Sequence, residues 1–148
     1  MEANDMNARS GFTLVELLVV VLIIAILATY VGVNVAREPG KARKAAAVMQ
    51  VKTLKAALEM YRMEQGHLPT QEQGLKALCE KPVLSPIPET YPGDGYLESR
   101  KLPVDPWGHE YVYLVPGSRG ESFEIICYGA DGREGGEAEN TDISSSEI

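Results

Sequence analysis

The hydrophobic and polar positions divide the chain into an apolar N-terminal part and an amphipathic remainder. Between Phe12 and Val33 most residues are apolar, and Glu16 is the only charged residue in these 22 positions. About 20 apolar residues in a helix, at about 1.5 Å each, cross a hydrocarbon layer of about 30 Å. Because backbone groups in lipid must bond to each other, the pattern predicts a membrane-spanning helix over 12–33.

Apolar residues return after this run with a different period. Pro39-Gly40 should break or kink a helix, because proline lacks the N–H and clashes with the preceding turn. From Lys41 onward the apolar positions are spaced by four, three, four and three residues, at Ala47, Val51, Leu54, Leu58 and Tyr61. This spacing predicts an amphipathic helix that ends near Gly66 and packs its apolar stripe on the chain's own sheet.

The rest of the chain alternates short elements with turns. Thr70 and Gln73 have capping-box spacing, which predicts a short second helix ending near Glu80. Prolines and glycines make 81–95 a loop. The segments 110–115 and 122–128 read as strands around a turn at 116–120, forming an antiparallel hairpin. The tail from Gly129 is rich in glycine and acid, without periodicity. The fold class is therefore α+β.

Composition limits the possible functions. The chain has 148 residues, 14 of them basic and 21 acidic, for a net charge of −7. This is enough for one small domain beyond the span, and so acidic a chain has no footprint for nucleic acid. His67 and His109 are isolated, and no nucleophile lies near a base, so we do not expect an enzyme. Cys79 and Cys127 could form a disulfide in an oxidising compartment or remain buried thiols.

The start of the apolar run carries a specific motif. Gly11-Phe12-Thr13-Leu14-Val15-Glu16 before an aliphatic run resembles the class III signal of type IV pilins and pseudopilins. The resemblance implies that a prepilin peptidase cuts after Gly11 and methylates Phe12. It also implies that Glu16 pairs with the N-terminal amine of a neighbouring subunit. That role fits the chemistry, because a charge in lipid is costly unless it finds a partner.

Later motifs resemble the major pseudopilins of type II secretion systems. They are Glu72-Gln73-Gly74-Leu75, Asp105-Pro106-Trp107-Gly108, Gly129-Ala130-Asp131-Gly132 and Asp142-Ile143. The resemblance implies a pilin-like fold, with a long N-terminal helix packed on a small antiparallel sheet. It implies a leader over 1–11, a transmembrane and assembly helix over 12–36, and a periplasmic domain over 37–148. Leu68 and the final Ser-Ser-Ser-Glu-Ile depart from the family's usual tyrosine and Gly-Asn-Trp.

The family's location and partners follow from the same resemblance. It implies a single-pass inner-membrane subunit that polymerises with its own copies and meets minor pseudopilins, the prepilin peptidase and the inner-membrane secretion platform. One observation opposes this orientation: Arg37, Lys41, Arg43 and Lys44 follow the span, and charge bias alone would keep that side cytoplasmic. The motif at Gly11–Glu16 is more specific than the charge bias.

The acidic tail is a candidate calcium site. Five acids between Asp131 and Asp142 sit in glycine-rich chain, and calcium prefers six to eight oxygen ligands. From spacing alone, a solvated acidic tail remains the other reading. The resemblance implies a structural calcium ion, with side chains of Asp131, Asn140 and Asp142 and the Tyr128 carbonyl as ligands.

Several alternatives remain at this point. The apolar run could be a cleaved secretory signal, although it lacks a clean small-residue cleavage site and contains an acid. It could also be a plain anchor. A type IV pilin or another pilin-like fibre subunit would share the N-terminal motif. A monomeric membrane-anchored binding domain would have no need for Gly11-Phe12 or Glu16.

Overall fold

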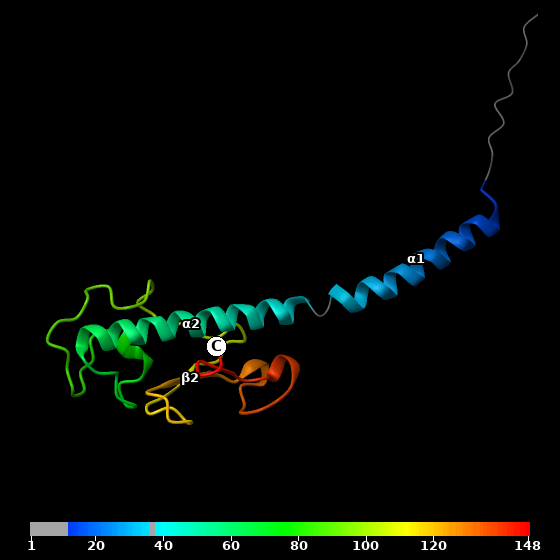
Figure 1. Cartoon of the computed structure of the whole chain (residues 1–148). Helices are drawn as coiled ribbons and strands as arrows, with labels where there is room; N and C mark the ends of the chain where they lie inside the picture. Colours follow the sequence, from blue (N-terminus) through cyan, green and yellow to red (C-terminus); the bar gives the residue numbers. More distant parts are fainter. Residues whose placement is uncertain (1–11, 36–37) are drawn as a thin grey trace, which may run out of the picture. The chain divides into compact units, whose positions relative to one another are not determined.

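The computed structural model describes residues 12–35 and 38–148 (Figure 1), and the side chains of 30–38 are outside this description. The chain divides into two compact units, one ending at Pro39 and the other starting at Gly40. The helices are α1 (Leu14–Val35) and α2 (Glu38–Gln65), and the strands are β1 (Val112–Leu114), β2 (Glu124–Cys127) and β3 (Ile143–Ser144). Three short 3-10 helices complete the elements: η1 (Leu75–Leu78), η2 (Gly129–Asp131) and η3 (Ala138–Asn140).

The first unit is built on α1. Thr13 caps this helix: its carbonyl accepts the backbone N–H groups of Glu16 at 3.1 Å and Leu17 at 3.2 Å. Its hydroxyl also accepts the Glu16 N–H at 3.2 Å. The large apolar side chains from Leu14 to Leu27 are exposed. Within the described residues, no helix has both the length and the apolarity needed to cross a membrane.

The second helix begins earlier than the sequence predicts. The chain forms two separate helices, as the expected break implies, but α2 starts at Glu38 instead of Lys41 and contains Pro39 and Gly40 in its first turn. Proline is tolerated there because the first N–H groups of a helix have no intrahelical partner. The helix ends at Gln65, and Gly66 follows with φ +76°, as expected for a helix stop.

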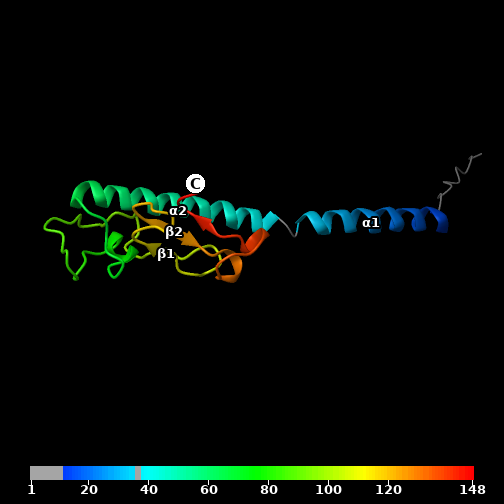
Figure 2. The same ribbon diagram turned by 60° about the horizontal axis from the view of Figure 1, so that its bottom comes forward.

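The apolar stripe of α2 forms the centre of the core, as predicted. Ala47, Val51, Leu54, Leu58 and Tyr61 are all buried. They pack with residues from the sheet and from η1, including Tyr113, Phe123, Ile125, Cys127, Leu75 and Leu78. Both views show α2 running along one side of the strands (Figures 1 and 2).

The sheet is antiparallel, with strand order β1-β2-β3. The predicted hairpin is confirmed, although its strands are shorter: Val112 pairs with Ile126 and Leu114 with Glu124. The third strand contradicts the expectation of a tail without regular structure. Cys127 pairs with Ile143 and Ile126 with Ser144, so the chain end returns to the sheet.

The segment between α2 and the sheet is mostly irregular. The capping box at Thr70 and Gln73 is confirmed in both directions, by bonds of 2.9 and 3.2 Å. It leads into a turn and the 3-10 helix η1, instead of an α-helix, and Leu75, Ala77 and Leu78 are buried there. Gly95 allows the following loop to pass close to η1, since a Cβ there would lie 2.7 Å from the Leu78 carbonyl oxygen.

Candidate functional site

The N-terminal motif lies partly outside the described residues, because the structure does not describe Gly11. Phe12 precedes the helix with 76% of its surface exposed. Glu16 lies in the first turn of α1, three residues after the Thr13 cap. A carboxylate at this place is favoured by the partial positive charge at a helix N-terminus. Phe12 and Glu16 are four residues apart, about one helical turn.

The acidic loop folds back on itself. The two short helices η2 and η3 lie at its two ends, and the Asn140 backbone passes between two glycines. A Cβ on Gly129 would lie 2.7 Å from the Asn140 carbonyl carbon, and a Cβ on Gly136 would lie 2.7 Å from its carbonyl oxygen. Both glycines have positive φ, +65° and +104°. This close packing brings Tyr128–Asp131 beside Asn140–Asp142.

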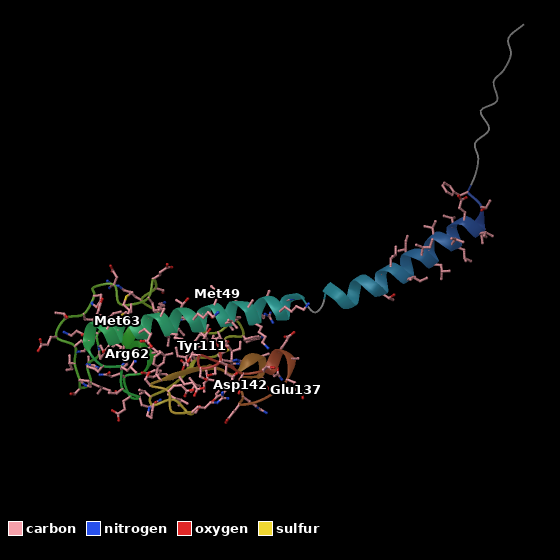
Figure 3. The ribbon with its side chains drawn as sticks, in the orientation of Figure 1. Met49, Arg62, Met63, Tyr111, Glu137 and Asp142 are labelled. Atoms are coloured by element: carbon pink, nitrogen blue, oxygen red, sulfur yellow. The ribbon has the colours of Figure 1, made fainter. Side chains whose placement is uncertain are left out.

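The predicted calcium ligands show one unsatisfied group. Asp142 accepts the Gly135 N–H at 2.8 Å with Oδ2 (Figure 3). Its other carboxylate oxygen, Oδ1, is buried and has no hydrogen-bond partner. Asp131 accepts the Arg133 N–H at 3.2 Å. Tyr128, Glu134 and Asp142 line one hollow of about 230 Å³. The hollow thus contains two of the four predicted ligand residues, Tyr128 and Asp142, together with Glu134, whereas Asp131 and Asn140 do not line it.

The residues of the loop carry the kinds of donor atom that a hard cation such as calcium binds. Carboxylate, amide and backbone carbonyl oxygens are the donors that calcium prefers, and a buried carboxylate oxygen without a partner is costly unless something satisfies it. Among the described residues, no three His, Cys, Asp or Glu side chains are grouped closely enough to hold a metal ion on their own. A calcium ion here would depend on Asn140 and backbone carbonyls as well as on acids.

Glu124 is a buried acid in the same hollow that the sequence does not single out. Only 3% of its surface is exposed. Its Oε2 accepts the Ser118 hydroxyl and, at 3.0 Å, the Ser118 N–H. Its Oε1 accepts the hydroxyls of Ser144 at 2.5 Å and Ser146 at 3.4 Å. The bonds from Ser118 and then Ser144 outweigh the effect of burial and lower the Glu124 pKa to about 2.

The serine-rich chain end is fixed by three elements. Ser145 accepts the Ile125 N–H at 2.9 Å with its hydroxyl and donates its own N–H to the Ile125 carbonyl at 2.9 Å. Lys55 of α2 donates to the carbonyls of Ser145 at 2.7 Å and Ile148 at 3.1 Å. Arg119 pairs with Glu147 at 2.8 Å. The final Ser-Ser-Ser-Glu-Ile, which differs from the family's usual ending, is therefore held to the domain by its own set of contacts.

The turn at Asp105 organises the other buried polar groups. Asp105 accepts the N–H groups of Trp107 at 2.9 Å and His109 at 2.8 Å with Oδ1. Its Oδ2 accepts the Cys127 thiol at 3.3 Å. Cys79 and Cys127 are both free and buried. Burial is the main reason that the Cys127 pKa rises to about 11, which makes this thiol a poor nucleophile near neutral pH.

Comparison with known protein families gives two matches. Residues 34–146 match the model described as type II secretion system (T2SS), protein G. Residues 6–31 match the prokaryotic N-terminal methylation motif. Together they cover the apolar run, with the motif at Gly11–Glu16, and nearly all of the second unit.

Individual relatives agree with the family models. The type II secretion system core protein G of Pseudomonas aeruginosa is 45% identical over 93% of this chain and 94% of its own length. That of Vibrio cholerae is 43% identical over 96% of this chain and 94% of its own length. A crystal structure of the major pseudopilin from the type 2 secretion system of enterohaemorrhagic Escherichia coli matches with a TM-score of 0.62 at 38% identity, covering 73% of this chain and 90% of that one. The pilin-like fold is confirmed, and this chain belongs to the type II secretion system protein G family, the family of major pseudopilins.

Proposed function

We propose that this major pseudopilin is cut after Gly11, methylated at Phe12, and polymerised through its N-terminal helix into a periplasmic fibre that drives protein export. The observation that supports this is the sequence Gly-Phe-Thr-Leu-Val-Glu at the entrance of a long apolar helix, within the matched methylation motif. Minor pseudopilins, the prepilin peptidase and the inner-membrane platform are its proposed partners. Each added copy would push the fibre outward.

Before assembly, the proposed state is a single-pass subunit in the inner membrane. The segment 12–33 would be the anchor and the domain from residue 37 would face the periplasm. The support is the composition of the segment, which has one charged residue in 22 positions. The same apolar side chains, exposed along α1, would be covered by neighbouring helices once the subunit enters the fibre.

The processing step can be tested by mass. The full chain is expressed with and without a prepilin peptidase, extracted from membranes, and analysed by intact mass and N-terminal sequencing. We expect a chain that starts at methylated Phe12 only when the peptidase is present. A chain that still starts at Met1 would favour the anchored monomeric domain instead.

Glu16 is proposed to pair with the new amine of Phe12 on a neighbouring copy. An ion pair in a low-dielectric helix bundle is strong only when both charges are present. We expect Glu16→Ala to insert in the membrane normally and to lose fibre assembly, measured as pelletable fibre against total subunit. Thr13→Ala is the control, because it removes the helix cap and leaves the carboxylate in place. A normal fibre from Glu16→Ala would refute the pairing.

We also propose a structural calcium ion in the loop between Asp131 and Asp142. The unpartnered Asp142 oxygen and the oxygen-rich donor set support it. When bound, the ion would neutralise carboxylates that otherwise repel. The chain's own residues would then hold η2 and η3 together and carry β3 back to the sheet. Because binding energy to the folded state adds to stability, calcium at about 100 times its Kd would contribute about 2.7 kcal/mol.

The calcium test uses a chain that lacks residues 1–36. We expect millimolar calcium to raise its melting temperature. Asp142→Asn should abolish most of that rise, while Glu110→Gln, which changes an exposed acid outside 131–142, should keep it. If millimolar calcium does not raise the melting temperature of the shortened chain without a substitution, the calcium site is ruled out.

A further inference from the structure

The outward face of α2 carries a second apolar stripe. Its members follow the same alternating spacing of four and three residues as the core stripe: Ala42, Ala46, Met49, Thr53, Ala56, Met60 and Met63. All of them are exposed, and the three methionines have 63, 49 and 76% of their surface accessible. Met49 lies on the side of α2 away from Tyr111 (Figure 3). Thr53 is the one hydroxyl residue of the stripe, and it donates to the Met49 carbonyl at 3.0 Å. Single exposed apolar residues are ordinary, but six on one helix face indicate a contact surface.

The same unit has an exposed apolar loop. Val83, Leu84 and Ile87 have 86, 46 and 54% of their surface accessible. The loop is held in place from inside: the amide of Gln73, itself 8% exposed, donates to the carbonyls of Leu84 at 2.7 Å and Pro86 at 3.0 Å. A buried amide thus holds an apolar loop at the surface. A surface fixed in advance loses less entropy when it binds.

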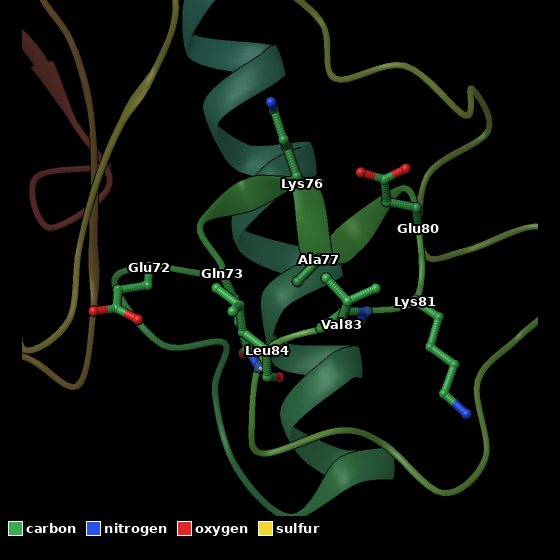
Figure 4. Close-up of a pocket in the computed structure, with 9 residues that line it drawn as sticks. Glu72, Gln73, Lys76, Ala77, Glu80, Lys81, Val83 and Leu84 are labelled. Atoms are coloured by element: carbon green, nitrogen blue, oxygen red, sulfur yellow. Dashed lines mark hydrogen bonds between the residues drawn. The ribbon is translucent and has the colours of Figure 1, made fainter.

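A hollow lies beside this loop, lined by apolar side chains and by four charged residues, Glu72, Lys76, Glu80 and Lys81. Its volume is about 280 Å³, and its lining includes the buried Gln73, Ala77 and Pro82 and the exposed Val83 and Leu84. In the close-up, Ala77, Val83 and Leu84 lie together, with the charged side chains of Glu72 and Lys81 on opposite sides of them (Figure 4). Methionine is unbranched and flexible, and it fills irregular apolar hollows well.

Charge separates the helix from the rest of its unit. Within α2 there are six basic and three acidic residues, whereas residues 66–148 contain six basic and 15 acidic residues. Lys52 borders the stripe, three residues after Met49 and four before Ala56. Glu80 and Glu89 are exposed and border the apolar loop, and the exposed Lys81 lies beside them. Opposite charges around two apolar surfaces favour their contact and fix its orientation.

We propose that the methionine stripe of one copy binds the 83–87 loop of the next, with a methionine side chain in the hollow beside Val83. This inference rests on the proposed fibre and names one of its lateral contacts. The two surfaces are different, so the contact is head-to-tail, and each copy leaves one surface open for another copy. Such a contact extends indefinitely, as a fibre requires, whereas a stripe binding another stripe would close a dimer.

Cysteine crosslinking tests the contact in the full chain, expressed with the prepilin peptidase and the other secretion components. A chain with Met60→Cys and Ile87→Cys, treated with a short thiol crosslinker, should give a ladder of covalent multimers in the fibre fraction. Neither single variant should give a ladder, and nor should Met60→Cys with Ser99→Cys, which adds an exposed cysteine outside both surfaces. Crosslinked dimers from Met60→Cys alone would indicate that stripes bind each other, and would overturn the proposal.

A charge in the stripe gives an independent test. Met60→Lys should fold, because the side chain is half exposed, and should lose most of its fibre. Val104→Lys is the matched control, an apolar residue of 51% exposure outside both surfaces, and should assemble normally. Fibre from the unmodified chain, together with normal fibre from Met60→Lys and no ladder, would refute this contact alone. Absence of fibre from the unmodified chain would refute the proposed function, and this contact with it.

Discussion

A single carboxylate, Glu124, connects the hairpin turn to the chain end. Glu124 forms no ion pair with the described residues. It is stabilised by the Ser118 N–H and by the hydroxyls of Ser118, Ser144 and Ser146. Such bonds favour the ionised form even when the group is buried. Removing the charge would leave hydroxyls oriented toward a weaker acceptor. The chain end should therefore become less stable in acid.

The sign of this effect follows from the lowered pKa of Glu124, which is about 2 in the fold against 4.5 for the free side chain. The unfolded chain binds the proton first, so the stabilisation is complete above about pH 4.5 and is lost as the pH falls toward 2. We expect Glu124→Gln to be less stable than the parent at pH 7, with the difference shrinking between pH 4.5 and 2. Urea unfolding of the chain lacking residues 1–36 measures this.

The control for that experiment is Glu110→Gln, since Glu110 is an exposed acid on the same unit. The free energy of unfolding of Glu110→Gln should equal that of the parent chain across the pH range. A constant difference between Glu124→Gln and the parent from pH 7 to pH 2 would mean that the Glu124 charge contributes nothing.

At the scale of elements, substitutions at two neighbouring glycines can distinguish the cost of backbone strain from the cost of a steric clash. Gly135 and Gly136 both have positive φ, +89° and +104°. A Cβ on Gly136 would lie 2.7 Å from the Asn140 backbone, while a Cβ on Gly135 would meet nothing within 4 Å. A side chain at positive φ costs about 1 kcal/mol or more at either position. Only at Gly136 must η3 also move.

We therefore expect Gly136→Ala to lower the melting temperature clearly more than Gly135→Ala, by an amount equivalent to at least about 1 kcal/mol. The larger effect should be accompanied by weaker binding of the proposed calcium ion, because η3 carries the proposed ligand Asn140. Equal losses from the two variants would show that the loop does not need this packing. Thermal unfolding with and without calcium gives both quantities.

The elements show which parts of the fold the sequence could predict. The core stripe from Ala47 to Tyr61 and the hairpin follow from local periodicity, and local periodicity is what a sequence displays directly. Strand β3 has two residues, and Ser144 and Ser145 are bonded to Lys55, Glu124 and Ile125, which are distant in sequence. No local pattern predicts such a strand.

The sequence does not identify Glu124 as a buried acid, for a related reason. In 123–127 the apolar residues alternate toward the core, so Glu124 reads as a solvent-facing position. The returning chain end covers that face, and its serines turn a surface acid into a buried one. The N-terminal motif differs in this respect. The resemblance to a family identifies Phe12 and Glu16, whereas the structure of the single subunit explains only the place of Glu16 next to the Thr13 cap.

At the scale of the whole molecule, the separation of charge between α2 and residues 66–148 should govern how copies meet. The exposed Arg43, Lys44 and Lys52 form no ion pair within the described part of the chain. Charges left unpaired in the subunit are available to a neighbour. Contacts of this kind depend on ionic strength, since the screening length falls from about 10 Å at 0.1 M salt to about 3 Å at 1 M.

Two variants that change the net charge equally can test this. Lys52→Glu reverses a charge beside the methionine stripe, and Lys101→Glu reverses an exposed charge elsewhere. At low salt we expect fibres of Lys52→Glu to dissociate more readily than those of Lys101→Glu, because the new carboxylate would face the net acidic 66–148 part of the next copy. In about 1 M salt that repulsion is screened, so the two variants should converge. Sedimentation of sheared fibres at both salt concentrations measures the difference. Equal dissociation at low salt would mean that net charge alone, and not its place on α2, controls the association of copies.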